Sequence, residues 1–240
     1  MRLAYRFRVL LCAILGLASP AAAQHSAVLV ELFTSQGCAA CPPADKLLET
    51  LADRDDVIAL ALHVDYWDYI GWADSFGNSA FSDRQKRYAR VRGRASVYTP
   101  QMIIGGIDEV KGSSRAQVMG TIATHLGMGG SANPKGVRLT LHSDQDTVLT
   151  VEAVAEYGLA YAAEIQLVRY KDSETVDILA GENAGRSVTY RNIVTSWQKL
   201  DNWDGQRPFR QTVQIEGDEA VVVVIQEQGQ GPVLAVARRR

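Results

Sequence analysis

Cysteine is scarce in this sequence: there are 3 in 240 residues, and one of them, Cys12, lies within the first dozen. The other two, Cys38 and Cys41, stand close together in the segment GCAACPPAD. Disulfide-stapled domains are rich in cysteine and usually join distant segments, whereas a bond between these two closes a loop too short to restrain the unfolded chain much. Stapling is therefore the weakest interpretation of the pair, which leaves a redox couple or a metal clamp.

Long apolar runs are absent as well. The run from Val9 to Leu17 is well short of the roughly 20 residues that span a bilayer. Three arginines precede it and small residues at Ala21 and Ala23 follow it, an order typical of a secretory signal peptide. The sequence therefore predicts a signal peptide over residues 1–23, a periplasmic or secreted protein, and no stable membrane insertion.

The chain has no excess of basic charge, since its formal net charge is −2 and removal of the arginine-containing leader makes it more acidic. An acidic balance argues against nucleic acid as a partner. Hydrophobic residues make up 47% of the sequence, enough to fill the core of one large domain or two ordinary ones. We therefore expect a globular protein.

The first half of the exported chain alternates predicted strands and helices. Continuous apolar runs indicate strands that are buried on both faces, and apolar residues spaced three and four apart indicate helices. Pro42 and Pro43 fit only the first turn of a helix, so the helix begins close to Cys41. The predicted elements are strands at 27–33, 57–64, 101–104 and 107–111, and helices from about 42, from 82 to 92 and from 114 to 127.

The second half of the chain has a different pattern. The glycine-rich segment GMGGSANP, residues 127–134, is typical of a domain junction. About seven short β-rich segments follow it with turn residues between them, which favours an antiparallel sandwich or barrel. We therefore predict two domains after the leader, at 24–130 and 131–240.

The motifs of the first half resemble the thioredoxin fold over about residues 27–126. The resemblance rests on the CxxC pair after a buried strand, the Thr99-Pro100 step before the third strand, and the closing hairpin and helix. More narrowly, the segments VELFTSQGCAACPPAD, HVDYWD, YTPQMIIGG and GENAGR resemble a family of secreted bacterial proteins described as domain of unknown function 1223. The fold implied is an α/β thioredoxin-like domain followed by an all-β, sandwich- or barrel-like domain.

Disulfide exchange requires an exposed thiolate and a second thiol that can resolve the mixed disulfide. A CxxC pair at a helix start meets both needs, because free amide groups and the helix dipole lower the pKa of the first thiol. Cys38 would therefore attack and Cys41 resolve, with no cofactor required. Partners would be a protein or small-molecule thiol or disulfide substrate and an exported electron-transfer protein.

The resemblance also supplies expectations for the residues around the pair. Thioredoxin-like proteins hold a cis proline against the CxxC segment, so Thr99 and Pro100 are expected beside Cys38, with the Thr99 backbone binding the substrate chain. The aromatic residues Tyr66 and Trp67 follow the second strand, where they either line a peptide groove or cover the sheet.

Glu31 interrupts an apolar strand seven residues before Cys38. An unpaired buried carboxylate is costly, so we expect it to be paired or to have a raised pKa. Thioredoxins carry a buried acid close to this place that helps to deprotonate the resolving thiol. The resemblance therefore makes Glu31 a proton acceptor for Cys41, with a strand-end acid that reaches solvent as the alternative.

Three functional hypotheses follow. The first is an exported thiol–disulfide oxidoreductase that uses Cys38 and Cys41. The second is a copper chaperone or metal-linked thioredoxin-like protein, because two thiolates and the imidazole of His63 suit Cu(I). The third is a non-enzymatic binding module, whose recognition segment would be the GENAGR loop at 181–186.

Overall fold

The computed structural model describes residues 27–127, 136–145 and 147–239. The predicted signal peptide at 1–23 and the predicted junction at 130/131 lie outside these residues. In chain order the elements are β1 (Val28–Thr34), α1 (Pro42–Ala52), β2 (Val57–His63), the 3-10 turn η1 (Asp68–Ile70), α2 (Ser79–Val91), β3 (Gln101–Ile104), β4 (Asp108–Lys111), α3 (Arg115–Gly127), β5 (Val137–Gln145), β6 (Val148–Ala155), β7 (Ala163–Ile178), β8 (Arg186–Trp203), β9 (Phe209–Gln214), β10 (Ala220–Glu227) and β11 (Val233–Arg239).

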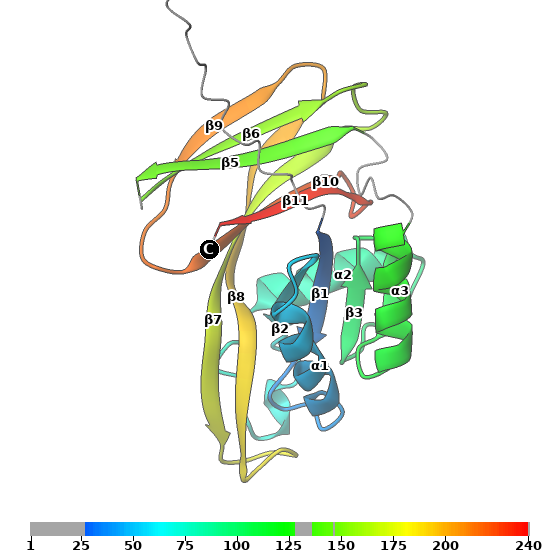
Figure 1. Cartoon of the computed structure of the whole chain (residues 1–240). Coiled ribbons are helices and arrows are strands. Elements are labelled where there is room, and N and C mark those ends of the chain that lie inside the picture. The colour runs from blue at the N-terminus through cyan, green and yellow to red at the C-terminus, as the bar shows by residue number, and fades with distance from the viewer. Residues whose placement is uncertain (1–26, 128–135, 146, 240) are drawn as a thin grey trace, which may run out of the picture.

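Strands from both halves of the chain join in one eight-stranded mixed sheet, in the order β11-β10-β7-β8-β2-β1-β3-β4. The join lies between β2 and β8, which run parallel with Ala61 opposite Ile193, and Asn192 donates a hydrogen bond of 2.8 Å to the Ala59 carbonyl. The prediction of an α/β thioredoxin-like domain followed by an all-β domain is therefore wrong. That prediction put the strands of the second half in a separate domain, whereas β8 pairs with β2 and extends the sheet (Figure 1).

The long strands β7 and β8 connect the two ends of the molecule (Figure 1). They pair antiparallel from Ala163 opposite Trp203 to Ile178 opposite Arg186, and the turn between them reaches the region of α1. A separate three-stranded sheet, β5-β6-β9, packs over the other end. Its apolar side chains, such as Leu149 and Val151, share a core with Val223 and Ile225 of β10.

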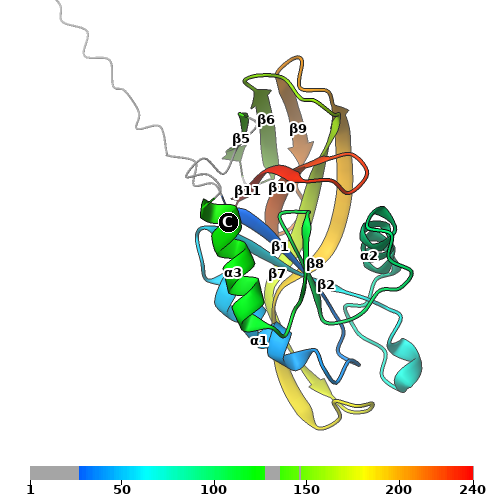
Figure 2. The ribbon, with the colours of Figure 1, turned by 90° about the vertical axis from the view of Figure 1, so that its right-hand side faces the viewer.

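The helices cover both faces of the sheet beside β1 and β2, with α1 and α3 on one face and α2 on the other (Figure 2). Val30 and Leu32 point into the core beneath α1, and Leu29 and Phe33 point into the core beneath α2. This two-sided burial explains the continuous apolar run of β1, in which every residue is buried. The strand, CxxC segment and helix thus follow one another as the sequence predicts.

Helix α2 begins at Ser79, three residues before the predicted start at Ser82. The Asn78 side chain caps it by accepting a hydrogen bond of 2.9 Å from the backbone N–H of Ala80. The predicted start came from the spacing of Ser82 and Gln85, which is typical of a capping box, but the Ser82 hydroxyl donates to the Asp65 carboxylate at 2.5 Å instead. The hairpin turn was predicted correctly, since Gly105 and Gly106 both adopt positive φ between β3 and β4.

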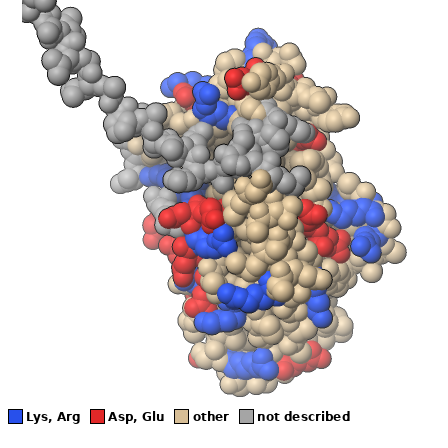
Figure 3. Space-filling model, turned by 45° about the vertical axis from the view of Figure 1, so that its right-hand side comes forward, with Lys and Arg blue, Asp and Glu red and all other residues tan. Residues whose placement is uncertain are grey.

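Charged side chains of both signs are interspersed over the face shown in Figure 3. None of the helices in the described part of the chain combines the length and the apolarity needed to cross a membrane.

Candidate functional site

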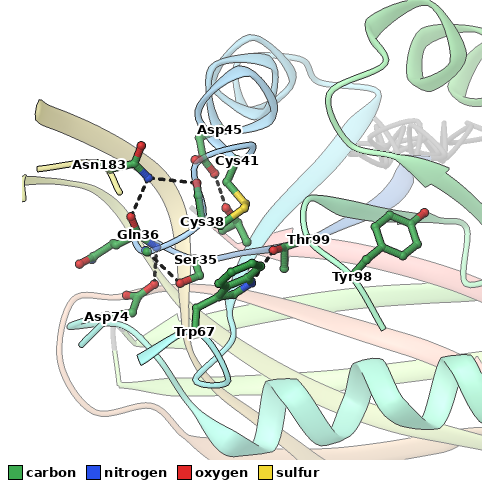
Figure 4. Close-up of a disulfide and its surroundings, with 12 residues drawn as sticks. Ser35, Gln36, Cys38, Cys41, Asp45, Trp67, Asp74, Tyr98, Thr99 and Asn183 are labelled. Atoms are coloured by element: carbon green, nitrogen blue, oxygen red, sulfur yellow. Dashed lines mark hydrogen bonds between the residues drawn. A yellow bond between two sulfur atoms is a disulfide. The ribbon is translucent and has the colours of Figure 1, made fainter. Parts of the chain in front are cut away.

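Cys38 and Cys41 form a disulfide at the start of α1, with their Cα atoms 5.4 Å apart (Figure 4). Cys41 is the N-cap residue of the helix, and its carbonyl accepts hydrogen bonds from the N–H groups of Ala44 and Asp45 at 2.8 and 3.1 Å. Pro42 and Pro43 follow Cys41 and carry no N–H. Pro42 and Pro43 therefore cannot supply the free amide groups that were expected to lower the pKa of the first thiol.

Neither cysteine is exposed: the relative accessibility is 1% for Cys38 and 0% for Cys41. The expectation that Cys38 is exposed is therefore not met in the disulfide-bonded protein. Among the residues that Figure 4 labels, Asp45, Trp67 and Thr99 lie around the disulfide.

The turn between β7 and β8 covers the CxxC segment. The buried side-chain amide of Asn183 donates to the carbonyls of Gln36 and Cys38, at 2.9 and 3.0 Å. Gly181, in the same turn, has a φ of 74° and lies so close to Trp72 that a Cβ atom there would come within 3.1 Å of the Trp72 Cβ. The GENAGR loop, which the sequence suggested as a recognition segment, is thus the wall on one side of Cys38.

A second wall comes from the segment after β2 and from the proline step. The Thr99-Pro100 peptide bond is cis, as the resemblance implied. Trp67 Nε1 donates to Thr99 Oγ1 at 2.7 Å, and both side chains lie near the disulfide (Figure 4). Tyr66 is turned toward α2 instead, where its hydroxyl donates to Gln85 at 3.0 Å and burial raises its pKa to about 12. The structure therefore places Trp67, but not Tyr66, beside the cysteines.

His63 is fully buried at the end of β2, with its ring in edge contact with Phe76 and Tyr190. Its Nδ1 lies 2.7 Å from the Asp74 carboxylate, which also accepts the backbone N–H of Gln36 at 2.8 Å. Burial opposes ionisation of Asp74, but the charge of His63 and these hydrogen bonds outweigh it, so the pKa of Asp74 is lowered. The dyad of His63 and Asp74 thus anchors the segment that leads to Cys38.

Asp45 lies one helical turn after Cys41 and is buried against the end of β1. Thr34 Oγ1 donates to its carboxylate at 2.7 Å. Burial raises the Asp45 pKa to about 7, and the charge of Asp74 adds to this effect, whereas the His63 charge and the Thr34 hydrogen bond oppose it. The sequence analysis missed Asp45. The signal that could have identified it is the presence of an acid on the apolar face of α1, beside Ala44 and Leu48.

Glu31 lies outside this cluster. It points to the face of the sheet under α2, opposite α1, where its two carboxylate oxygens accept hydrogen bonds from Arg84 at 2.5 and 3.1 Å. Tyr88 donates a third, at 2.6 Å. The expectation that Glu31 is paired is correct. Its partners are Arg84 and Tyr88, on the face of the sheet away from α1, so Glu31 does not lie where it could accept the proton of Cys41. The alternative of a strand-end acid that reaches solvent is wrong, since Glu31 is 0% exposed.

The residues suggested as copper ligands do not form a metal site in the described part of the chain. Within the described ranges, no three His, Cys, Asp or Glu side chains are arranged to hold a metal ion. Of the suggested ligands, Cys38 and Cys41 are bonded to each other, and His63 has its Nδ1 at the Asp74 carboxylate.

These features define a class of proteins in which a CxxC disulfide at a helix start is set into a sheet shared by an α/β half and a β-rich half. The chain belongs to the family described as protein of unknown function (DUF1223), which matches residues 29–226. It is similar to a crystal structure of a protein from Agrobacterium tumefaciens, with 29% identity and a TM-score of 0.75 over 90% of this chain and 95% of that one.

A second solved structure is much less similar. A domain of the outer membrane lipoprotein Omp28 from Porphyromonas gingivalis is 9% identical, with a TM-score of 0.26 over 45% of this chain and 88% of that one, too low to carry an argument. No curated protein sequence matches the chain significantly.

Proposed function

We propose that this protein is an exported thiol–disulfide oxidoreductase that acts on protein or small-molecule thiols and disulfides. The observation that carries the proposal is the bond between Cys38 and Cys41 at the start of α1. It joins the only cysteines beyond Cys12, and a titratable carboxyl group, Asp45, lies one turn away. A structural staple would need neither a helix start nor a titratable neighbour, and it would close a longer loop.

The exchange proceeds in two displacement steps. The Cys38 thiolate attacks a substrate disulfide, so that a mixed disulfide forms and one substrate sulfur leaves as a thiolate, which takes up a proton. The Cys41 thiolate then attacks Cys38 Sγ, the bond to the substrate breaks, and the second substrate sulfur leaves in the same way. The substrate disulfide is thereby reduced and the protein dithiol oxidised. A partner dithiol protein reduces the Cys38–Cys41 disulfide again, and the reverse sequence oxidises a substrate dithiol.

The main test of this function is the Cys41→Ser variant, expressed in the organism and exported. Since a serine hydroxyl at this position cannot resolve the mixed disulfide, we expect covalent partners to accumulate on Cys38 and to be released by dithiothreitol. Cys38→Ser is the matched control and should trap nothing. Abundant exported Cys41→Ser protein without any reducible adduct would contradict the proposal. Full biological activity of the variant that lacks both thiols would favour a binding module instead.

Cys38 is 1% exposed, and the turn between β7 and β8 is hydrogen-bonded to its carbonyl, so we expect movement of this turn to help a substrate reach the sulfur. The Asn183→Ala variant loses the two hydrogen bonds to Gln36 and Cys38. Since each hydrogen bond contributes about 0.5–1.5 kcal/mol, we expect the disulfide to be reduced by dithiothreitol about tenfold faster, or more. Reduction can be followed by alkylation of the released thiols and mass spectrometry.

Glu182→Ala is the control for this experiment, because Glu182 is an exposed neighbour of Asn183 in the same loop. It should react at the wild-type rate. An equal acceleration in both variants would show that any disturbance of the loop has this effect. An unchanged rate in Asn183→Ala would show that the Asn183 hydrogen bonds do not hold the turn between β7 and β8 over the CxxC segment.

A further inference from the structure

Behind the disulfide lies a buried group of ionisable side chains that thiol exchange by itself leaves unused. Thr34 and His63 are opposite each other in the parallel pair of β1 and β2, and each stands at the end of its strand on the face beneath α1. Asp45 comes down from the first turn of α1, Asp74 comes from the loop before α2, and Tyr190 comes from β8. Separate parts of the chain therefore place two carboxyl groups and an imidazole under the CxxC segment.

We propose that Asp45, with His63 and Asp74 as its positioning residues, accepts the proton of the Cys41 thiol when Cys41 resolves the mixed disulfide, and returns it when the disulfide is reduced. This inference rests on the proposed function.

The position of Asp45 suits this role. It follows Cys41 by four residues, so the two side chains lie on the same face of the helix start. Figure 4 shows the Asp45 carboxyl group beside Cys41. The hydrogen bond from Thr34 Oγ1, at 2.7 Å, fixes the orientation of the carboxyl group.

The surroundings of Asp45 allow it to exist with and without a proton. Burial favours the neutral carboxylic acid and raises its pKa to about 7, as does the charge of Asp74, while His63 and Thr34 favour the carboxylate. Tyr190 packs against His63, and burial together with Asp45 and Asp74 raises its pKa, so it faces the cluster as a neutral phenol. A general base is most effective when its pKa lies near the working pH.

His63 is hydrogen-bonded to one of the two acids, Asp74, and acts on the other, Asp45, through its charge. Its Nδ1 is held at 2.7 Å by Asp74, and its Nε2 is buried without a hydrogen-bond partner in the described part of the chain. Such an orphaned nitrogen is costly in a purely structural histidine. Here the imidazole provides a charge that favours the ionised form of Asp45, while Asp74 fixes the orientation of the ring.

The proposed step is balanced. The thiol proton of Cys41 moves to the Asp45 carboxylate, the Cys41 sulfur bonds to Cys38 Sγ, and the electron pair of the broken bond leaves with the substrate sulfur. When a reducing dithiol attacks Cys38, the Cys41 sulfur leaves and takes the proton back from the Asp45 carboxylic acid.

The experiment mixes reduced full-length mature protein with glutathione disulfide, quenches with acid, and quantifies the glutathione adduct of Cys38 and the internal disulfide by mass spectrometry. In Asp45→Asn we expect the adduct to accumulate, because conversion to the internal disulfide slows about 10²-fold at pH 7. The difference from wild type should shrink above about pH 9, where a thiol with an ordinary pKa of about 8.5 ionises without a base. Glu49→Gln, a partly exposed acid on the same helix, should behave as wild type.

A second variant tests the same point without removing the base. Thr34→Val deletes a hydrogen bond that favours the carboxylate, so the pH midpoint of the conversion rate should move upward. A wild-type rate and pH profile in Asp45→Asn, or an unmoved midpoint in Thr34→Val, overturns the role of Asp45 and leaves the proposed function standing. A wild-type protein that forms no adduct and no internal disulfide overturns the proposed function, and the role of Asp45 with it.

Discussion

The Arg84→Met variant is expected to unfold with a free energy about 3–5 kcal/mol lower than that of the wild type. Arg84 is 3% exposed and donates to both oxygens of Glu31, which is 0% exposed. Although burial opposes the charge on Arg84, the charge of Glu31 outweighs it, so the pKa of Arg84 is raised. Removal of the guanidinium leaves the Glu31 carboxyl group in the core without a cationic partner, with only the Tyr88 hydroxyl still donating to it. Urea denaturation at pH 7 measures the difference.

The same arginine also ties the two halves of the chain together. Its guanidinium donates to Gln226 of β10 at 3.1 Å and stacks on the ring of Trp197 of β8 at 3.8 Å. Its loss should therefore weaken the contact between α2 and the strands of the second half as well as the ion pair. A lower slope of unfolding against urea, together with the lower free energy, would be the sign of partly independent unfolding of the two halves.

Two controls separate the charge from the packing. The double variant Arg84→Met, Glu31→Leu removes both charges and should recover most of the lost stability, because apolar replacement of a buried ion pair is often neutral or stabilising. Lys86→Met changes an exposed base on the same helix and should stay within about 0.5 kcal/mol of wild type. A loss in the double variant as large as in Arg84→Met would mean that the unpaired carboxylate is not the cause.

The local structure around the cysteines could be predicted from the sequence because it depends on neighbours along the chain. The apolar run of β1, the two prolines after Cys41 and the spacing of Leu47, Leu48 and Leu51 each act over a few residues. These signals place the CxxC pair between a buried strand and a helix without knowledge of any distant contact.

The assembly of the halves could not be predicted in this way. A strand with alternating exposure, such as β9, fits a separate sandwich or the edge of a larger sheet equally well. The parallel contact between Ala61 and Ile193 joins segments more than 100 residues apart in the sequence, and no local pattern specifies it. The resemblance to the thioredoxin fold therefore predicted the order of elements in the first half but not the eight-stranded sheet.

The site shows the same division. Cys38 and Cys41 were identified from their spacing, but the partners that surround them come from far along the chain. Gln36 meets Asp74 across 38 positions, and Cys38 meets Asn183 across 145. Glu31 and Asp45 are both acids in apolar patterns near the cysteines. Glu31 points to the core under α2, whereas Asp45 lies on α1, on the opposite face of the sheet, and this difference decides which acid lies beside Cys41.

The stability of the oxidised protein should depend on pH through Asp45. Its pKa is raised from 3.8 to about 7 on folding, so the folded state holds this proton more tightly than the unfolded chain. The resulting stability is fully present below about pH 4 and is lost as the pH rises to 7, by at most about 4 kcal/mol. Asp45→Asn lacks this loss, so its free energy of unfolding should gain on that of wild type between pH 4 and 7 and run parallel to it above about pH 8. Urea titrations at several pH values, with Glu49→Gln as the control, measure the gap, and a gap independent of pH would show that the buried carboxyl group does not titrate in this range.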